Sequence, residues 1–263
     1  QDVILATKVH YPMADGINAS RNTRRHIIQQ CEASLKRLGT DYIDLYQLHG
    51  TNADIPIDEA LRAMDDLVKA GKVLYLGTSG FAAWEFLESL WASKEHGLNR
   101  FISEQPPYNL LDRRIERELI PMAKTYGAAI LPWAPSAGGF FSEKYAKGEP
   151  PPTGSRYEAF WQGFYKESFT ADVIFRIQEV VLEIAKEKGV SGYALSLAWC
   201  MQQPGVTSPI IGPRTSEQLT DALTALEVSF SEEDLERINL AAPPESMVVP
   251  YIDFKGKHEY HWM

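Results

Sequence analysis

Polar side chains with catalytic potential stand at the ends of several short apolar runs in this sequence. Lys8 ends the first run, and His49 directly follows the second. Ser79, Gln105 and Trp133 stand at the ends of three later runs. The carboxyl ends of parallel strands meet at the ligand site of β/α proteins, so this spacing predicts one site built from several strands. A histidine in such a site can hold a substrate oxygen or move a proton near neutral pH.

Each of these residues also has a purely structural interpretation. Taken alone, His49 fits a core or capping histidine, Lys8 fits an interior lysine paired with a carboxylate, and Trp133 fits a core aromatic residue. The occurrence of Lys8 and His49 at the ends of two neighbouring predicted strands favours the chemical interpretation.

Patterns typical of buried strands and of amphipathic helices alternate along the chain. We expect strands at residues 3–9, 43–49, 73–77, 101–105, 129–133 and 208–211. We expect helices at about 23–38, 58–70, 83–93, 113–126, 172–188, 192–203, 216–225 and 231–239, and a Gly- and Pro-rich loop at 136–170. No Gly-x-Gly-x-x-Gly motif follows the first strand, so the alternation favours a (β/α)8 barrel over a doubly wound sheet.

Charge and composition limit the kinds of partner. The 263 residues carry a net charge of −9 at pH 7, which argues against nucleic acid and against a membrane surface. No apolar run approaches the ~20 residues that a membrane span needs. Cys31 and Cys200 each lie in an apolar, helix-like stretch, which is typical of reduced core thiols in a cytoplasmic protein.

Residues 34–49, reading Ser-Leu-Lys-Arg-Leu-Gly-Thr-Asp-Tyr-Ile-Asp-Leu-Tyr-Gln-Leu-His, resemble the signature of the aldo-keto reductase family. Residues 6–8 are similar to the lysine strand of that family, and residues 210–219 to its cofactor-binding segment. In detail the chain resembles the branch that includes bacterial aldehyde reductases and potassium-channel β subunits. The resemblance implies a TIM (β/α)8 barrel that uses NADPH to reduce small aldehydes and ketones to alcohols by hydride transfer. The resemblance is compatible with either a monomer or a homo-oligomer.

The resemblance also implies roles for individual residues. His49 would orient the carbonyl, and Lys8 would lower the pKa of an acidic tyrosine. Trp133 would stack on the nicotinamide, while Ser79 and Gln105 would hold its carboxamide, although Gly80 stands where the family usually has Asn. The remaining cofactor residues would contact the phosphates and the adenosine: Pro135, Ser136, Gly138, Lys144, Arg156, Gly212, Arg214, Gln218 and Asp221. For Lys144 and Arg156, solvated loop charges are the alternative.

The chain shows one more serious departure from the family pattern. The family places its acidic tyrosine and an aspartate ahead of the lysine strand, and the pattern gives six strands where a closed barrel has eight. We therefore expect a single domain at residues 1–263 that lacks the first two β/α units, forms an open six-stranded arc and has impaired turnover. Tyr11 and Tyr108 are the other tyrosines that we considered as proton donors.

Two other functions remain open at this point. In the first, the chain binds NADPH as a regulatory or interaction protein without significant turnover; in the second, it is a structural module on the same fold.

Two further motifs have no predicted role in the site. The charged residues 112–117 are interpreted as the solvated start of a helix. His258 and His261 have a spacing that suits a metal, but no third ligand is evident, so we predict no metal site.

Overall fold

The computed structural model describes residues 2–16, 18–52, 54–155, 157–158 and 171–251. These residues form two compact units. The first unit holds the described residues up to Pro106 together with Met122–Ala129. The second unit holds Pro107–Pro121 together with Ile130–Tyr251. A single domain over residues 1–263 stays a prediction.

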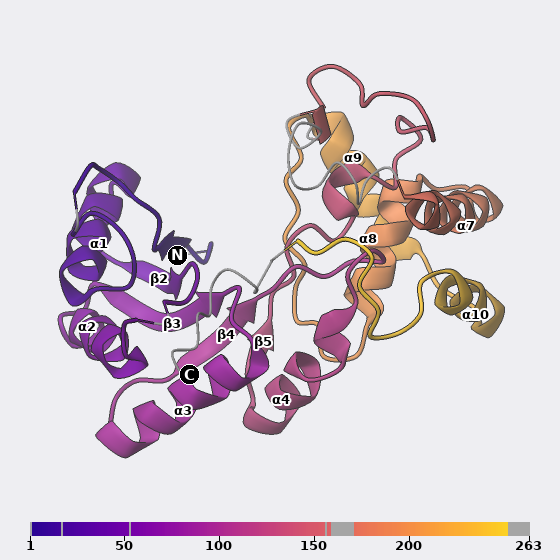
Figure 1. The fold of residues 1–263 in the computed structure, drawn as a ribbon. Helices are drawn as coiled ribbons and strands as arrows, with labels where there is room; N and C mark the ends of the chain where they lie inside the picture. The colour runs from indigo at the N-terminus through magenta and orange to yellow at the C-terminus, as the bar shows by residue number, and fades with distance from the viewer. Residues whose placement is uncertain (1, 17, 53, 156, 159–170, 252–263) are drawn as a thin grey trace. The chain divides into compact units, whose positions relative to one another are not determined.

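Parallel strands and covering helices alternate in the first unit (Figure 1). The helices α1, α2 and α3 pack in succession. In sheet order, the strands are β1 (Ala6–Val9), β2 (Ile43–Leu48), β3 (Val73–Ser79), β4 (Phe101–Gln105) and β5 (Ala129–Ile130). The helices between the first four strands are α1 (Arg24–Leu38), α2 (Ile57–Lys69) and α3 (Ala83–His96). The α/β class is confirmed, and β1 lies at a sheet edge as expected.

Local signals place the ends of α1 where the sequence predicts them. The Thr23 hydroxyl accepts a hydrogen bond from the His26 N–H (3.3 Å) and so satisfies one donor of the first turn. Gly39 ends the helix with φ of 66°, in the left-handed region that glycine adopts without a steric penalty. Ile27, Cys31 and Leu35 lie on the buried face of this amphipathic helix, whereas Leu38 in its last turn is exposed.

The two faces of this sheet have different neighbours. The Tyr46 hydroxyl donates to the Ile27 carbonyl of α1 (3.2 Å), which shows that Tyr46 points toward the helices. Because side chains alternate along a strand, Gln47 points to the opposite face, and so does Lys8, its partner in the parallel register. Gly77 pairs with Gln47 on that face, where a Cβ would come within 2.5 Å of the Ser103 Oγ.

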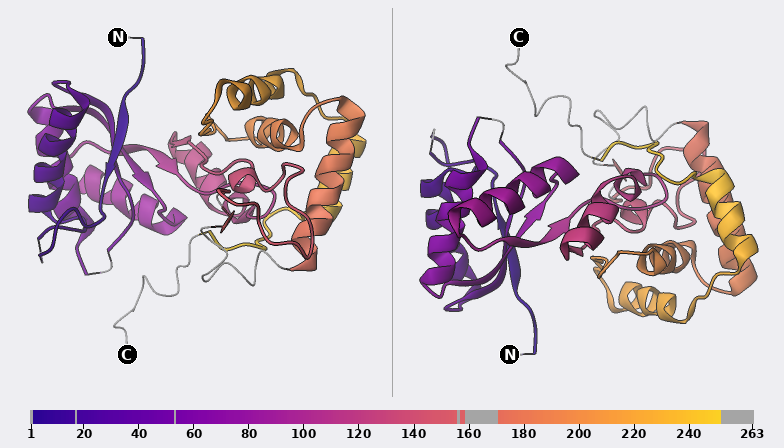
Figure 2. Two further views of the ribbon diagram at one scale, coloured as in Figure 1. Left: turned by 90° about the horizontal axis from the view of Figure 1, so that it is seen from above. Right: turned by 90° about the horizontal axis from the view of Figure 1, so that it is seen from below.

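Helices dominate the second unit. In both views of Figure 2, α7 and α10 run alongside each other, and α7 also packs on α8, which packs on α9. Their bounds are α7 (Asp172–Lys188), α8 (Gly192–Gln202), α9 (Ser216–Thr224) and α10 (Glu232–Ala241). Three short 3₁₀ segments complete the unit, namely η1 (Arg114–Glu116), η2 (Ala137–Gly139) and η3 (Ala225–Glu227). Helix α4 (Leu119–Tyr126) belongs partly to each unit.

Four predicted elements differ from the structure. The expected buried strand at 3–9 begins at Ala6, and Val3 and Ile4 ahead of it are exposed. The expected strand at 129–133 is only the two residues of β5, because Pro132 has no N–H for a sheet ladder. The expected strand at 208–211 is not a strand, although the Ile210 N–H donates to the Pro132 carbonyl (2.7 Å). The expected helix at 113–126 is split into η1 and α4. The sheet of the described residues therefore has five strands, and the predicted count of six β/α units is not confirmed.

The buried positions of the two cysteines agree with the sequence. Cys31 and Cys200 are free and fully buried, as expected for core thiols. Within the part of the chain that the structure describes, no helix combines the length and the apolar character that crossing a membrane requires.

Candidate active site and cofactor pocket

Two candidate catalytic residues share one face of the first unit. Lys8 is on β1 and His49 directly follows β2, two residues beyond the register partner of Lys8. The His49 N–H donates to the Val9 carbonyl (2.9 Å), which extends the β1–β2 pairing and fixes the histidine backbone. Burial lowers the pKa of Lys8. The ring of Tyr11 lies edge-on to the His49 ring at a centroid distance of 4.9 Å.

Amide and hydroxyl groups continue this face across β3 and β4. The Ser79 hydroxyl donates to the Gln105 carbonyl (2.9 Å), and the Gln105 amide donates to the Gln47 side-chain oxygen (3.3 Å). Gln47 in turn donates to the Thr78 carbonyl (3.2 Å). Ser79 and Gln105 are buried, so their positions are held by neighbours within the same unit. The structure thus brings together the two residues expected to hold a carboxamide.

Sequence reasoning missed a carboxyl group that holds the loop after Ser79. Glu104 is fully buried on the helix side of β4. One of its oxygens accepts hydrogen bonds from the N–H groups of Gly80 (2.6 Å) and Phe81 (3.1 Å), and the other lies against the Thr78 hydroxyl. Burial raises the pKa of Glu104 to about 8, although these three donors oppose the shift. The available signal was an ionisable residue inside an otherwise buried strand.

The second unit contains a pocket of about 520 Å³. Its wall includes the turn from Ala134 to Gly139, in which Ala134, Ala137, Gly138 and Gly139 all have positive φ. Non-glycine residues rarely adopt such angles, and they persist only where the surroundings enforce them. Successive turn residues of this kind present their N–H groups to one side, an arrangement that binds anions in other proteins.

Helix α9 begins at the same pocket. The Thr215 hydroxyl caps its first turn by accepting the Gln218 N–H (3.3 Å), and the Gln218 side chain accepts the Arg214 N–H (2.7 Å). The helix N-terminus carries a partial positive charge, which favours an anion beside it. On the next turn, Asp221 accepts a hydrogen bond from the Ser191 hydroxyl (2.9 Å).

Two cations face the interior of this pocket. The pKa of Lys144 is lowered by partial burial and by the positive charge of Arg214. The Lys144 ammonium also lies 5.1 Å from the centre of the Tyr145 ring. Because two like charges repel, their proximity is unfavourable unless an anion lies between them. The donor set therefore fits a phosphate-bearing ligand.

Most of the predicted cofactor residues line this pocket. Its lining includes eight of them: Pro135, Ser136, Gly138, Lys144, Gly212, Arg214, Gln218 and Asp221. Trp133 is two residues from Pro135, and its ring lies edge-on to that of Tyr251 at 5.7 Å. Ser79 and Gln105 belong to the first unit. Arg156, His258 and His261 lie outside the described residues, and the described part of the chain contains no cluster of side chains that could hold a metal.

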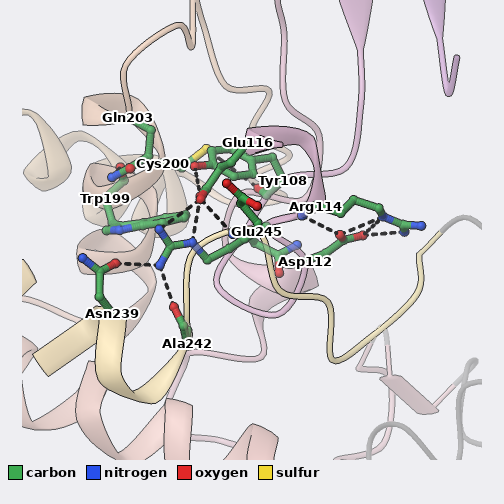
Figure 3. Close-up of polar contacts among 12 residues, drawn as sticks. Tyr108, Asp112, Arg114, Glu116, Trp199, Cys200, Gln203, Asn239, Ala242 and Glu245 are labelled. Carbon is green, nitrogen blue, oxygen red and sulfur yellow. Dashed lines mark hydrogen bonds and ion pairs between the residues drawn. The ribbon is translucent and has the colours of Figure 1, made fainter. Parts of the chain in front are cut away.

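The interpretation of residues 112–117 as a solvated helix start is wrong. Figure 3 shows Asp112, Arg114 and Glu116 within polar networks of the second unit, whereas Arg117 is exposed. Arg113, only 4% exposed, donates to Glu116 (2.7 Å), to the Asn239 side chain (2.8 Å) and to the Ala242 carbonyl (2.6 Å). Its guanidinium group lies 5.1 Å from the centre of the Trp199 ring. Charges at this spacing usually face water, but here distant residues supply their partners.

The same network decides between the two tyrosines considered as proton donors. The fully buried Tyr108 donates its hydroxyl hydrogen to Glu116 (2.7 Å). Burial and the charge of Glu116 raise the pKa of Tyr108 far above its usual range, so it is a poor acid. Tyr11, by contrast, is largely exposed and contacts His49.

The chain belongs to the aldo-keto reductase family, whose model, described as Aldo/keto reductase family, matches residues 1–242. Members of this family are oxidoreductases that generally use nicotinamide cofactors. The family resemblance seen in the sequence is thus confirmed.

Individual relatives include enzymes and channel subunits. The chain is 37% identical to the "Uncharacterized oxidoreductase YrpG" of Bacillus subtilis, over 91% of the chain and 72% of that protein. It is 34% identical to a "Probable voltage-gated potassium channel subunit beta" of Oryza sativa, over 86% of the chain and 69% of that protein. It is 32% identical to the "Versiconal hemiacetal acetate reductase" of Aspergillus parasiticus, over 89% of the chain and 66% of that protein.

Proposed function

We propose that this protein is an NADPH-dependent reductase of small aldehydes and ketones. The pocket of the second unit carries this proposal, because Lys144 and Arg214 both line it and it lies beside the N-terminus of α9. Such a site suits a dianionic phosphate more than a neutral hydroxyl. The two cofactors NADPH and NADH differ at one position, where NADPH has a 2′-phosphate and NADH has a hydroxyl.

Different residues of this pocket contact different parts of the cofactor. Arg214 is the bidentate donor for the 2′-phosphate, and Lys144 contributes a second positive charge. The backbone N–H groups of Ser136 and Gly138 bind the pyrophosphate, since those of Ala137 and Gly139 are donated to carbonyls within the turn. Gln218 and Asp221 contact the adenosine. These assignments are supported by the common pocket and by the family's use of nicotinamide cofactors.

The strand-end residues of the first unit act on the reacting groups. Ser79 and Gln105 hold the carboxamide, in positions fixed by their mutual hydrogen bond. When bound, NADPH supplies the hydride that reduces the carbonyl carbon. The carbonyl oxygen would take up a proton, for which Tyr11, whose ring contacts that of His49, is the candidate donor. His49 donates a hydrogen bond to this oxygen, and the Lys8 ammonium stabilises its negative charge.

Steady-state kinetics with an aromatic aldehyde test this proposal. We expect slow turnover with NADPH, because the buried Tyr108 is a poor acid and the exposed Tyr11 is the other proton donor considered. We also expect a loss of kcat on His49→Ala and a raised KM for NADPH with unchanged kcat on Arg214→Ala. Arg117→Ala is the matched control, since Arg117 is exposed and is not among the pocket residues. Equal effects of Arg214→Ala on NADPH and NADH would contradict the assignment of the 2′-phosphate.

A cofactor-binding protein without turnover is the second candidate. The similarity to a protein named as a channel β subunit favours it. Binding of NADPH with no reduction of aldehydes, ketones or quinones would support this candidate and exclude the reductase. Failure to bind either cofactor would exclude both candidates.

A further inference from the structure

Gln178 is a buried polar residue on a helix face that is otherwise apolar. Among the buried residues of α7, a helix that the structure describes throughout, Gln178 is polar and the others are apolar. The residue is 5% exposed, and an amide in such a place costs free energy unless its hydrogens find acceptors. The acceptors that the amide reaches therefore indicate what this glutamine does.

The acceptors of the Gln178 amide belong to one loop, at residues 140–145. The amide nitrogen donates to the Phe140 carbonyl (2.9 Å) and to the Tyr145 carbonyl (3.1 Å), and the Ser142 carbonyl lies 3.5 Å away. An amide has two hydrogens, so one side chain ties the first and the last residue of this loop to α7. The rings of Phe140 and Tyr145 are also stacked, with their centroids 5.8 Å apart, so the loop closes on itself.

This loop carries Lys144 into the wall of the cofactor pocket, which Ser142 also lines. A Cβ on Gly139 would lie 3.9 Å from the Lys144 ammonium nitrogen, so the ammonium lies beside the end of the 134–139 turn. Its other neighbour is the Tyr145 ring, at 5.1 Å from the ring centre, and Gln178 holds the backbone of that same tyrosine. A long lysine side chain on a loose loop would have to be ordered when an anion binds, which costs affinity.

We propose that Gln178 is a positioning residue for Lys144 and contributes in this way to a preference for NADPH over NADH. The tie between α7 and the 140–145 loop holds the Lys144 backbone in place before the cofactor arrives, so less ordering is needed when the 2′-phosphate binds. Gln178 itself is buried and is not among the residues that line the pocket. This inference rests on the function proposed above, because it takes Lys144 as a contact of the 2′-phosphate.

Calorimetric titration of the full chain with NADPH and with NADH tests this inference. Gln178→Met keeps the length of the side chain but removes both donors, so we expect it to weaken NADPH binding about three- to tenfold. NADH binding should change by less than about twofold, since NADH lacks the 2′-phosphate that Lys144 contacts. Gln202→Met is the matched control, because Gln202 on α8 donates to the Val228 carbonyl (2.7 Å) and is not among the pocket residues. Thermal melts verify that each variant is folded.

A double-mutant cycle separates positioning of Lys144 from a merely structural role. Lys144→Met removes the group that Gln178 holds in place, so adding Gln178→Met to it should cause no further loss of NADPH affinity. Additive losses in the double variant, equal losses for the two cofactors, or an NADPH affinity that Gln178→Met leaves unchanged would each overturn the inference.

Hydrogen exchange of the cofactor-free chain distinguishes failure of this inference from failure of the proposed function. Gln178→Met should speed amide exchange at residues 139–145, where the N–H groups of Phe140 and Ser142 donate to backbone carbonyls, and Gln202→Met should not. Unchanged exchange would overturn the inference whatever the cofactor affinities are. Faster exchange in a chain whose wild type does not prefer NADPH would instead contradict the proposed function, and the contribution of Gln178 to cofactor preference would be refuted with it.

Discussion

Glu104 should make the stability of the first unit depend on pH in an unusual direction. Its carboxyl is fully buried, and burial raises its pKa from 4.5 to about 8. The unfolded chain releases this proton near the ordinary pKa, whereas the folded chain retains it until about pH 8. Between these values the folded state binds more protons than the unfolded state, so the free energy of unfolding falls as pH rises.

The size of this effect follows from the shift. Each pKa unit is worth about 1.4 kcal/mol, so ionisation of Glu104 costs roughly 3 kcal/mol of folding stability at pH 7 and roughly 5 kcal/mol above pH 8. The Glu85 charge adds to the shift, and the donors Thr78, Phe81 and Gly80 reduce it. Nearly the whole effect should be absent at pH 4.5 and below.

Glu104→Gln should remove this dependence without disturbing the hydrogen bonds. The Thr78 hydroxyl has one hydrogen, and both the Ser103 carbonyl (3.2 Å) and Glu104 lie within its reach. If that hydrogen goes to Ser103, a protonated Glu104 donates to the Thr78 oxygen. A glutamine amide donates in the same place, and its oxygen still accepts from Gly80 and Phe81.

Urea unfolding at pH 5, 7 and 9 measures the difference between the two chains. We expect the variant to match the wild type near pH 5 and to become progressively more stable than the wild type up to pH 9. Glu88→Gln is the control, because Glu88 is an exposed carboxylate on the adjacent helix. Parallel stability curves for Glu104→Gln and the wild type would refute the reasoning, and so would a variant that is destabilised equally at every pH.

Three further outcomes follow from named contacts. Arg113→Met should destabilise the second unit by about 1–3 kcal/mol in urea unfolding, because Glu116 loses its charged partner and keeps only the Tyr108 hydroxyl and the Glu245 N–H as donors; the exposed Arg117→Met should change stability by less than about 0.5 kcal/mol. Gly77→Ala should cost about 1–3 kcal/mol, because its Cβ would approach the Ser103 Oγ at 2.5 Å, and adding Ser103→Ala should recover most of the loss; no recovery would count against this contact. His49→Asn should lower kcat for an aromatic aldehyde but leave the dissociation constant of NADPH unchanged, and a parallel loss of NADPH binding measured by fluorescence would argue against a role at the carbonyl.

Features set by neighbouring residues were predictable from the sequence. The ends of α1 depend on Thr23 and Gly39, which act within one helical turn. The parallel strands β2 and β4 follow from short apolar runs, and the polar residues at their ends follow from the alternation of strands and helices. The clustering of Lys144 with Arg214 followed from the family resemblance, since these residues are 70 positions apart in sequence.

Features that depend on distant partners were not predictable in this way. Arg113 is buried because Asn239 and Ala242, at least 126 residues away, accept its hydrogen bonds. No local pattern separates such an arginine from one that faces water. Glu104 is similar, because its burial depends on the backbone of the loop after β3. The strand expected at 208–211 has apolar residues of the right kind, but its backbone makes too few ladder hydrogen bonds.

Calorimetric titration with NADPH and NADH, on the wild type and on Arg214→Ala, tests the central claim most directly. Each charge-assisted hydrogen bond to the 2′-phosphate is worth about 1.5–3 kcal/mol, so the wild type should bind NADPH at least about tenfold more tightly than NADH. The variant should lose most of this preference while its affinity for NADH stays the same. Equal affinities of the wild type for the two cofactors, or a preference that survives in the variant, would contradict the account.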